Sequence, residues 1–157
     1  MRKRRYTALL FGILAVAWVG VMFFFSGQSA ANSSQLSLKV TRLIFEWFPD
    51  MGMGPADFEP ILRKIAHFIV FAIEGFLLSF ALIGFLGRGR GALVAVGLCA
   101  LLAVADEYHQ TFSIDRSCEF RDMLIDLGGA VTGIAAAVAV VALLAMVGKK
   151  STSRTLK

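Results

Sequence analysis

Residues 65–86 read IAHFIVFAIEGFLLSFALIGFL, and this stretch decides the fold class. A helix that spans a bilayer needs roughly 20 predominantly apolar residues. Only His67 and Glu74 interrupt the stretch with ionisable side chains. We therefore predict a transmembrane helix. An unpaired carboxylate at the depth of Glu74 would be costly, so we expect it to be protonated or paired.

Three more apolar blocks flank this stretch, at about 6–25, 92–110 and 123–147. Of the 157 residues, 57% are hydrophobic and 17% charged, whereas soluble domains have about 45–50% and about 25%. The first block is longer than the apolar core of a signal peptide, so we expect an uncleaved anchor. The sequence predicts an all-α integral membrane protein: one domain over 1–157, forming a four-transmembrane-helix bundle.

A long polar segment, 26–62, separates the first two spans. Within it, Leu36, Val40, Leu43, Ile44 and Trp47 follow helical spacing, which predicts a short amphipathic helix in an extracytoplasmic loop. A serine or asparagine at 32–34 is expected to cap its start. This helix either lies in the membrane interface or packs against the rim of the bundle. The Pro- and Gly-containing stretch 49–55 then breaks the helix.

The basic residues predict the orientation. Segments 1–5, 87–91 and 148–157 hold four, two and four of the sixteen Lys and Arg residues, and none of the eleven acidic residues. Cytoplasmic segments carry such an excess of positive charge. We therefore expect a multi-pass protein of a bacterial plasma membrane with both termini in the cytoplasm.

Polar residues gather at the extracytoplasmic ends of three predicted spans. The uncharged part of the third span, 92–105, is too short for the hydrocarbon layer, so the carboxylates that follow must lie at or below headgroup level. Ionisable groups at that depth usually face a bundle interior or a wet cavity. We predict one outward-opening polar pocket lined by Arg63, His67, Asp106, Glu107, Gln110, Arg116, Asp122 and Asp126.

The residue types suggest two roles within this pocket. Proton transfer is predicted for His67, Asp106, Glu107 and Asp122. Substrate binding is predicted for Arg63, Gln110, Arg116 and Asp126, with an arginine for an anionic headgroup.

Each of these residues also has a purely structural interpretation. His67 could hydrogen-bond a neighbouring helix. Asp106 and Glu107 could form a solvated helix end, and Arg116 and Arg121 could pair on the surface with Glu119 and Asp122.

Several other functions are not expected. The basic clusters flank apolar spans, as anchors and topology signals do, so no nucleic-acid partner is predicted. No metal or cofactor is expected, since the chain has two histidines and neither an HExxH motif nor paired cysteines. Cys99 falls inside a span and Cys118 in a loop, so we expect no disulfide.

The chain resembles the VanZ-like family of bacterial membrane proteins. Three pieces carry the resemblance: 25–28 (FSGQ), 63–68 (RKIAHF), and the pattern Asp106, Glu107, Gln110, Phe112, Arg116, Asp122, Asp126, Gly129 and Gly133. Family members often have Pro-Gly before the loop arginine, where this chain has Ile114 and Asp115, and often Asn at the position of Asp126. The resemblance implies a multi-pass envelope protein, associated in some members with resistance to teicoplanin, a glycopeptide antibiotic.

Two classes of function follow from these observations. In the first, the protein acts on or binds an envelope lipid or lipid-linked glycan at the outer leaflet and influences teicoplanin susceptibility. In the second, it is a non-catalytic accessory protein, lipid carrier or small transporter whose polar cluster holds the helices together. The transporter interpretation depends on Glu74 near the membrane midplane.

Overall fold

The computed structural model describes residues 2–155, with the side chains of residues 5–147. Every regular element in that range is a helix: α1 (Arg2–Ser26), α2 (Ala30–Trp47), α3 (Pro55–Leu86), α4 (Arg88–Gln110) and α5 (Phe120–Thr155). Most side chains of the two terminal basic clusters, at 1–4 and 148–157, lie outside the described residues. The all-α fold class is confirmed.

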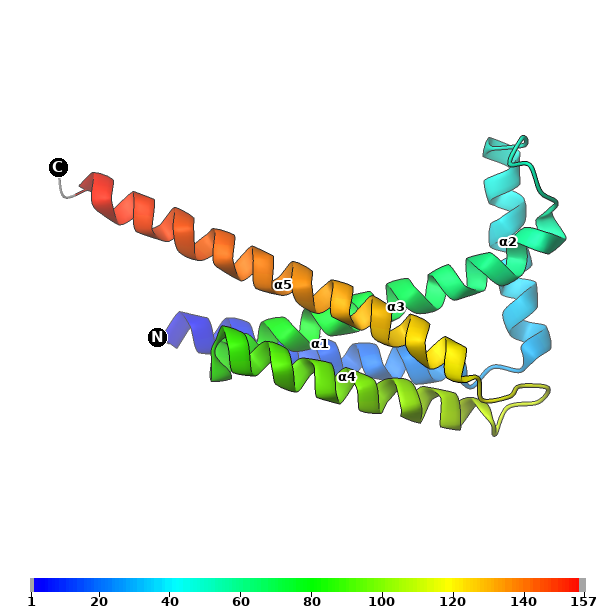
Figure 1. Cartoon of the computed structure of the whole chain (residues 1–157), viewed down its shortest axis with the longest axis horizontal. Helices are drawn as coiled ribbons and strands as arrows, with labels where there is room; N and C mark the ends of the chain where they lie inside the picture. The colour runs from blue at the N-terminus through cyan, green and yellow to red at the C-terminus, as the bar shows by residue number, and fades with distance from the viewer. Residues whose placement is uncertain (1, 156–157) are drawn as a thin grey trace.

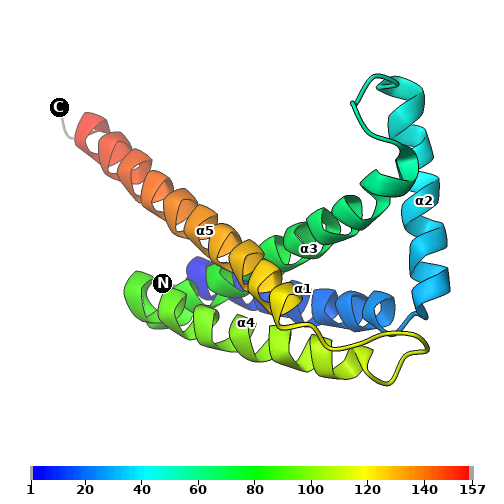
Figure 2. The same ribbon diagram turned by 45° about the vertical axis from the view of Figure 1, so that its right-hand side comes forward.

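Four of these helices are long and apolar enough to cross a membrane, namely α1, α3, α4 and α5. Both ends of the described chain lie at the same end of the bundle as the α3–α4 turn (Figure 1). Helix α2 and the connection 111–119 lie at the opposite end, where α2 runs steeply across the spanning helices (Figure 2). The bundle therefore has two chemically different ends, one with α2 and one with the termini.

The spanning helices extend beyond the apolar blocks that predicted them. Helix α3 begins at Pro55 rather than at residue 65, so the polar segment 26–62 is largely helical. Proline at the first helical position and Asp57 in the first turn are both favourable helix starts. With 32 residues, α3 is about 48 Å long, more than a hydrocarbon layer of about 30 Å. Similarly, α4 begins at Arg88 and α5 at Phe120, because polarity marks the membrane boundary and not the end of a helix.

Helix α2 packs on α3 through one side only. Thr41 is fully buried, and the ring of Phe45 lies 5.7 Å from that of Phe58 at the start of α3. Leu43 and Trp47 stay 56% and 79% exposed, which leaves an apolar face for a membrane interface. The predicted cap at 32–34 is wrong: the Ser29 side chain accepts the Asn32 N–H at 3.3 Å, because the helix starts three residues earlier than the polar pattern suggested.

Glycine allows α5 to approach α3 closely. A Cβ atom on Gly129 would collide with the carbonyl oxygen of Phe68, and one on Gly133 with that of Ala72. Inside a membrane, helices associate through such close van der Waals packing and not through the hydrophobic effect. These two contacts fix how α5 is rotated about its axis relative to α3, and so where its polar side chains point.

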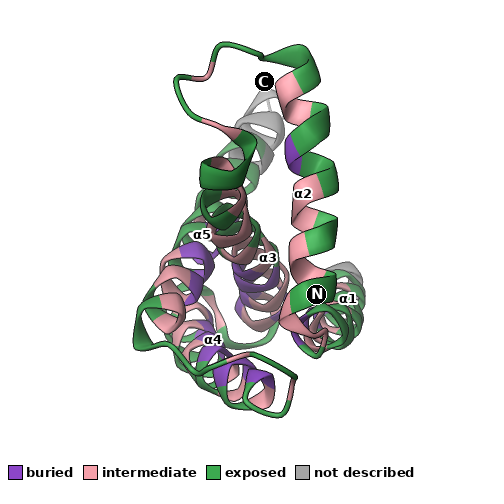
Figure 3. Cartoon of the chain, turned by 90° about the vertical axis from the view of Figure 1, so that its right-hand side faces the viewer, coloured by how far each residue is buried: buried purple, intermediate pink, exposed green. Residues whose placement is uncertain are grey.

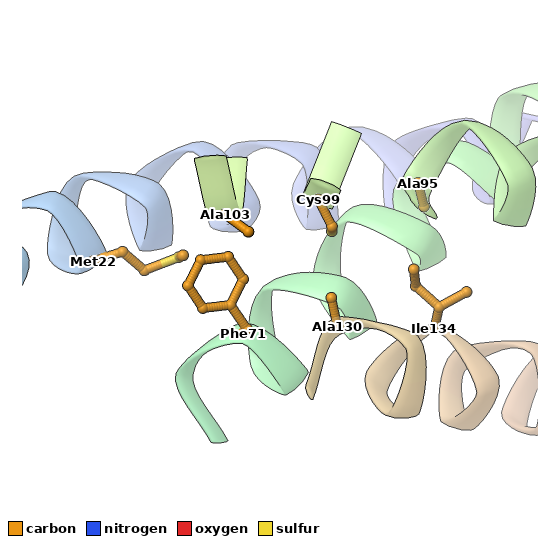
Figure 4. Close-up of a cluster of buried hydrophobic side chains, with 7 residues drawn as sticks. All are labelled: Met22, Phe71, Ala95, Cys99, Ala103, Ala130 and Ile134. Atoms are coloured by element: carbon orange, nitrogen blue, oxygen red, sulfur yellow. The ribbon is translucent and has the colours of Figure 1, made fainter. Parts of the chain in front are cut away.

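Phe71 on α3 is at the centre of the buried apolar cluster. In Figure 4 its ring lies between Met22 of α1 and Ala103 of α4. Small residues surround the ring and let the four spans converge. Most of the buried residues (purple in Figure 3) lie on the inner sides of α3, α4 and α5, and α1 and α2 contribute a few more. The cluster comprises Met22, Phe71, Ala95, Cys99, Ala103, Ala130 and Ile134.

Candidate functional site

Helices α3, α4 and α5 bring three ionisable side chains together in the half of the bundle next to α2. His67 of α3, Asp106 of α4 and Asp126 of α5 each offer one ligand-type atom, and these atoms lie within 4.8 Å of one another. The imidazole Nδ1 of His67 is 3.3 Å from Oδ1 of Asp126. The expected proximity of His67 to Asp106 is therefore observed, but the nearest carboxylate is that of Asp126.

A buried hydrogen-bonded group forms at the end of α4. Asp106, Glu107 and Gln110 are only 2%, 1% and 6% exposed. The Gln110 amide donates from Nε2 to Oδ2 of Asp106 at 3.0 Å and to Oε1 of Glu107 at 3.3 Å. The interpretation of Asp106 and Glu107 as a solvated helix end is therefore wrong. Span length already argued against it, because a short apolar block draws its terminal residues inward.

The connection 111–119 folds back over this group. The backbone N–H of Glu119 donates to Oε2 of Glu107 at 2.7 Å. Arg116 donates from Nη1 to Oε1 of Gln110 at 3.0 Å and to the carbonyl oxygen of Ser26 at 3.5 Å. Asp115 has φ 58°, a left-handed conformation that Asp tolerates better than most side chains and that glycine adopts freely. The turn thus forms without the Pro-Gly pair often found in the family.

Asp122 pairs with Lys64, which is not one of the predicted site residues. Its Oδ1 lies 3.8 Å from Nζ of Lys64, whereas Arg116 bonds Gln110 and Arg121 is exposed. The suggested surface pairing of Arg116 or Arg121 with Asp122 is therefore replaced by the pair with Lys64, and Arg116 interacts with Asp122 only at longer range. Lys64 could have been found from its spacing, since it lies three residues before His67 on the same helix face.

A cavity of about 290 Å³ opens between α1, α2 and α3 beside this cluster. Its polar end is lined by Arg63, His67, Asp106 and Arg116, and its apolar part by Trp18, Met22, Val70 and Phe71. The indole Nε1 of Trp18 donates to the carbonyl oxygen of Val70 at 3.0 Å and so holds α1 against α3. The apolar lining could not be found from the sequence, because nothing distinguishes those side chains from others that face lipid.

Two arginines at the polar end differ in their bonding. Arg116 is held by the contacts described above, but within residues 5–147 no side chain pairs with the half-buried Arg63 guanidinium. Burial lowers the pKa of Arg116, and the nearby positive charge of Arg63 lowers it further. Like charges held together at the mouth of a cavity favour an anion between them.

Glu74 lies away from this site, in the middle of α3. It is 1% exposed, its Oε2 has no hydrogen-bond partner, and no ion pair to it occurs among the described side chains. The interpretation of Glu74 as a paired residue is not supported. Cys99 is buried, Cys118 is exposed, and both are free, as predicted.

Six of the eight predicted site residues fall into two connected groups. Asp106, Glu107, Gln110 and Arg116 form one hydrogen-bonded network, and His67 with Asp126 forms the other, adjoining group. Asp122 lies at the edge with Lys64, and Arg63 lines the cavity. A histidine oriented by a carboxylate can transfer protons, and the same donor types can hold a divalent cation.

A comparison with protein families gives a match for this chain. The family model described as VanZ/LLP1 matches residues 11–144, which covers most of the sequence and all eight site residues. No curated protein and no solved structure matches the chain.

Proposed function

Since this chain belongs to the VanZ-like family, we propose that it binds an anionic envelope lipid or lipid-linked glycan at the extracytoplasmic leaflet. The binding site is the cavity between α1, α2 and α3. The observation that carries this proposal is Arg63, a half-buried cation that lines the cavity without a protein partner.

The two arginines suit a phosphate or carboxylate headgroup. A guanidinium offers several N–H donors in a planar fork, which matches the oxygens of such anions. Arg116 is already fixed by Gln110, so it can contact an anion with little further loss of side-chain entropy. An anion between Arg63 and Arg116 would also relieve their mutual repulsion.

The apolar part of the cavity suits a hydrocarbon chain. Trp18, Met22, Val70 and Phe71 line it directly beside the arginines, so the cavity is amphipathic over a short distance. Binding sites for small molecules commonly combine an apolar lining with a few placed polar groups. An anionic lipid likewise has a charged headgroup directly joined to hydrocarbon chains.

The proposal includes an orientation and a phenotype. The end that carries α2 faces outward, and both termini lie in the cytoplasm, in keeping with the placement of basic residues. We infer that lipid binding at this end alters susceptibility to teicoplanin, an association known for some members of the family.

Quenching of tryptophan fluorescence tests the binding site. The chain has two tryptophans, so a Trp47→Phe background leaves Trp18, which lines the cavity, as the reporter. In nanodiscs, lipids brominated in the acyl chain should quench Trp18 more strongly when the headgroup is phosphatidylglycerol than when it is phosphatidylcholine.

The matched variants are Arg63→Gln and Arg42→Gln, the second on the exposed side of α2. Arg63→Gln should abolish the difference between the two headgroups, and Arg42→Gln should preserve it. Equal quenching by both lipids in the parent protein would refute the proposal.

A reaction on the bound headgroup is a second candidate, favoured by the His67–Asp126 pair at the polar end of the cavity. A carboxylate that orients a histidine is a common arrangement in acid–base catalysis. Lipid profiles of cells with and without the protein distinguish the two candidates. A converted headgroup would support the enzyme, and redistribution of unchanged lipids would support a binding protein or carrier.

A further inference from the structure

Two buried carboxylates beside His67 retain oxygens without a partner. Asp126 is 0% exposed and Asp106 is 2% exposed. Oδ1 of Asp126 faces His67 and Oδ2 of Asp106 accepts from Gln110, but Oδ2 of Asp126 and Oδ1 of Asp106 have no hydrogen-bond partner. A buried polar atom without a partner is destabilising, especially in a carboxylate. A proton, a hydrogen-bond donor or a bound cation would satisfy these two oxygens, and no described side chain donates to them.

The distances agree with a shared cation. Nitrogen and oxygen ligands lie about 2.0–2.2 Å from Zn²⁺ in a tetrahedral site, so two of its ligands are separated by about 3.4 Å. Nδ1 of His67 and Oδ1 of Asp126 are already 3.3 Å apart, and the donor atoms of His67, Asp106 and Asp126 all lie within 4.8 Å of one another. The widest pair of donor atoms therefore has to close by about 1.4 Å at most for all three to bind one ion.

We propose that His67, Asp106 and Asp126 form a binding site for one divalent transition-metal cation, Mn²⁺ or Zn²⁺. A mixed set of one imidazole and two carboxylates suits these ions better than Mg²⁺ or Ca²⁺, which prefer oxygen ligands alone. The proposal does not depend on lipid binding, since none of its three ligands is Arg63 or Arg116.

The surroundings support a cation at this position. Gln110 donates to Oδ2 of Asp106 and leaves Oδ1 of Asp106 free for an ion. Residues that orient a metal ligand commonly hydrogen-bond it in this way. His67 is 23% exposed and lines the cavity with Asp106, so an ion from the outer face can reach the site. The four nearby carboxylates Asp106, Glu107, Asp122 and Asp126 outnumber the three nearby cations Arg63, Lys64 and Arg116, a balance that favours an added positive charge.

The site could not be found from spacing in the sequence. His67 and Asp126 are 59 residues apart and come from different helices, and Asp106 comes from a third. Short metal motifs place two ligands on one helix or loop, whereas here each helix contributes one. The expectation of no metal was based only on the absence of such motifs.

Metal titration of the untagged, full-length protein in nanodiscs tests the site. The amount of bound Mn²⁺ is measured from the loss of the free-ion signal in electron paramagnetic resonance. Zn²⁺ binding is measured by its competition with Mn²⁺. One ion per chain is expected. Asp126→Asn and Asp106→Asn should each weaken binding by at least about 10–100-fold, the loss that removal of a group supporting a ligand already causes. Asp115→Asn, an exposed carboxylate at the same end of the bundle, is the matched control and should bind as the parent does.

A second measurement identifies the ligand without removing a carboxylate. The chain has only two histidines, His67 and His109, so nitrogen coupling to bound Mn²⁺ in pulsed resonance spectra must come from one of them. The coupling should persist in His109→Gln and vanish in His67→Gln. Coupling that survives His67→Gln, or absence of bound Mn²⁺ and Zn²⁺ in the parent at sub-millimolar metal, would overturn the proposal. Equal loss of affinity in Asp115→Asn would do so too, since the ion would then be held by surface charge.

Discussion

Nδ1 of His67 on α3 lies 3.3 Å from Oδ1 of Asp126 on α5, and Asp126 is fully buried. The contact joins α3 and α5, the two helices with the most extensive packing against each other. It lies about one turn of α5 from the point where Gly129 meets the backbone of Phe68. A histidine in this position is oriented by the carboxylate, and its ring borders the cavity. The polar site and the tightest helix contact are therefore adjacent parts of one structure.

Substitutions that conserve shape separate chemistry from packing at this site. His67→Gln and Asp106→Asn keep much of the hydrogen-bonding capacity but remove the imidazole and the carboxylate charge. Arg116→Lys keeps the charge but loses the planar fork. We expect near-normal protein levels in membranes for each variant. Under the proposed function, the difference in teicoplanin tolerance between cells with and without the protein should disappear for the first two variants and decrease for the third.

The control for this set is Asp57→Asn, an exposed carboxylate at the start of α3. It should keep the parental tolerance. Full tolerance in His67→Gln, Asp106→Asn and Arg116→Lys together would show that the polar cluster only holds the helices together.

Membrane topology follows from four crossings. A reporter fused after Lys157 should be active as a cytoplasmic marker, and one inserted after Met51, in the connection between α2 and α3, as an extracytoplasmic marker. Alkaline phosphatase and a fluorescent protein provide the two readouts. Extracytoplasmic activity after Lys157 would contradict the predicted orientation.

The contact between α3 and α5 should tolerate no additional atom. In Gly133→Ala the new Cβ would overlap the backbone of Ala72 and force the helices apart, so we expect a loss of about 1–3 kcal/mol in the free energy of unfolding. Gly97→Ala is the matched control, because a Cβ there meets nothing within 4 Å. It should leave stability unchanged or raise it by up to about 1 kcal/mol, since alanine favours the helix.

Thermal unfolding in a mild detergent provides this measurement. If Gly133→Ala were as stable as Gly97→Ala, the close approach of α5 to α3 would be wrong, and with it the placement of Asp126 beside His67.

Glu74 is expected to contribute nothing to stability as a carboxylate. It is 1% exposed with an unpartnered Oε2, so a neutral amide of similar size loses no interaction and carries no cost for keeping a carboxyl group uncharged. Glu74→Gln should unfold at the same temperature as the parent or a higher one, with unchanged teicoplanin tolerance. A loss of tolerance in a stable Glu74→Gln protein would instead favour the small transporter, the one interpretation that gives this residue a function.

The sequence by itself determined the number of candidate spans and predicted the end of the bundle to which each polar residue belongs. Hydropathy and length are local properties, because a helix rises a fixed distance per residue and must match the bilayer. The same argument predicted that Asp106 and Glu107 face the bundle interior, and their burial agrees with this.

The tertiary structure decided the partners. Asp126 contacts His67, Asp122 contacts Lys64, and Arg116 reaches back to Gln110 and Ser26. Each pairing depends on how far a helix is rotated and raised against its neighbour, and backbone contacts between distant segments, such as Gly133 with Ala72, fix that geometry. The hydropathy of one helix contains no information about this rotation, so the cavity and the cluster of His67, Asp106 and Asp126 emerge only when the helices are packed together.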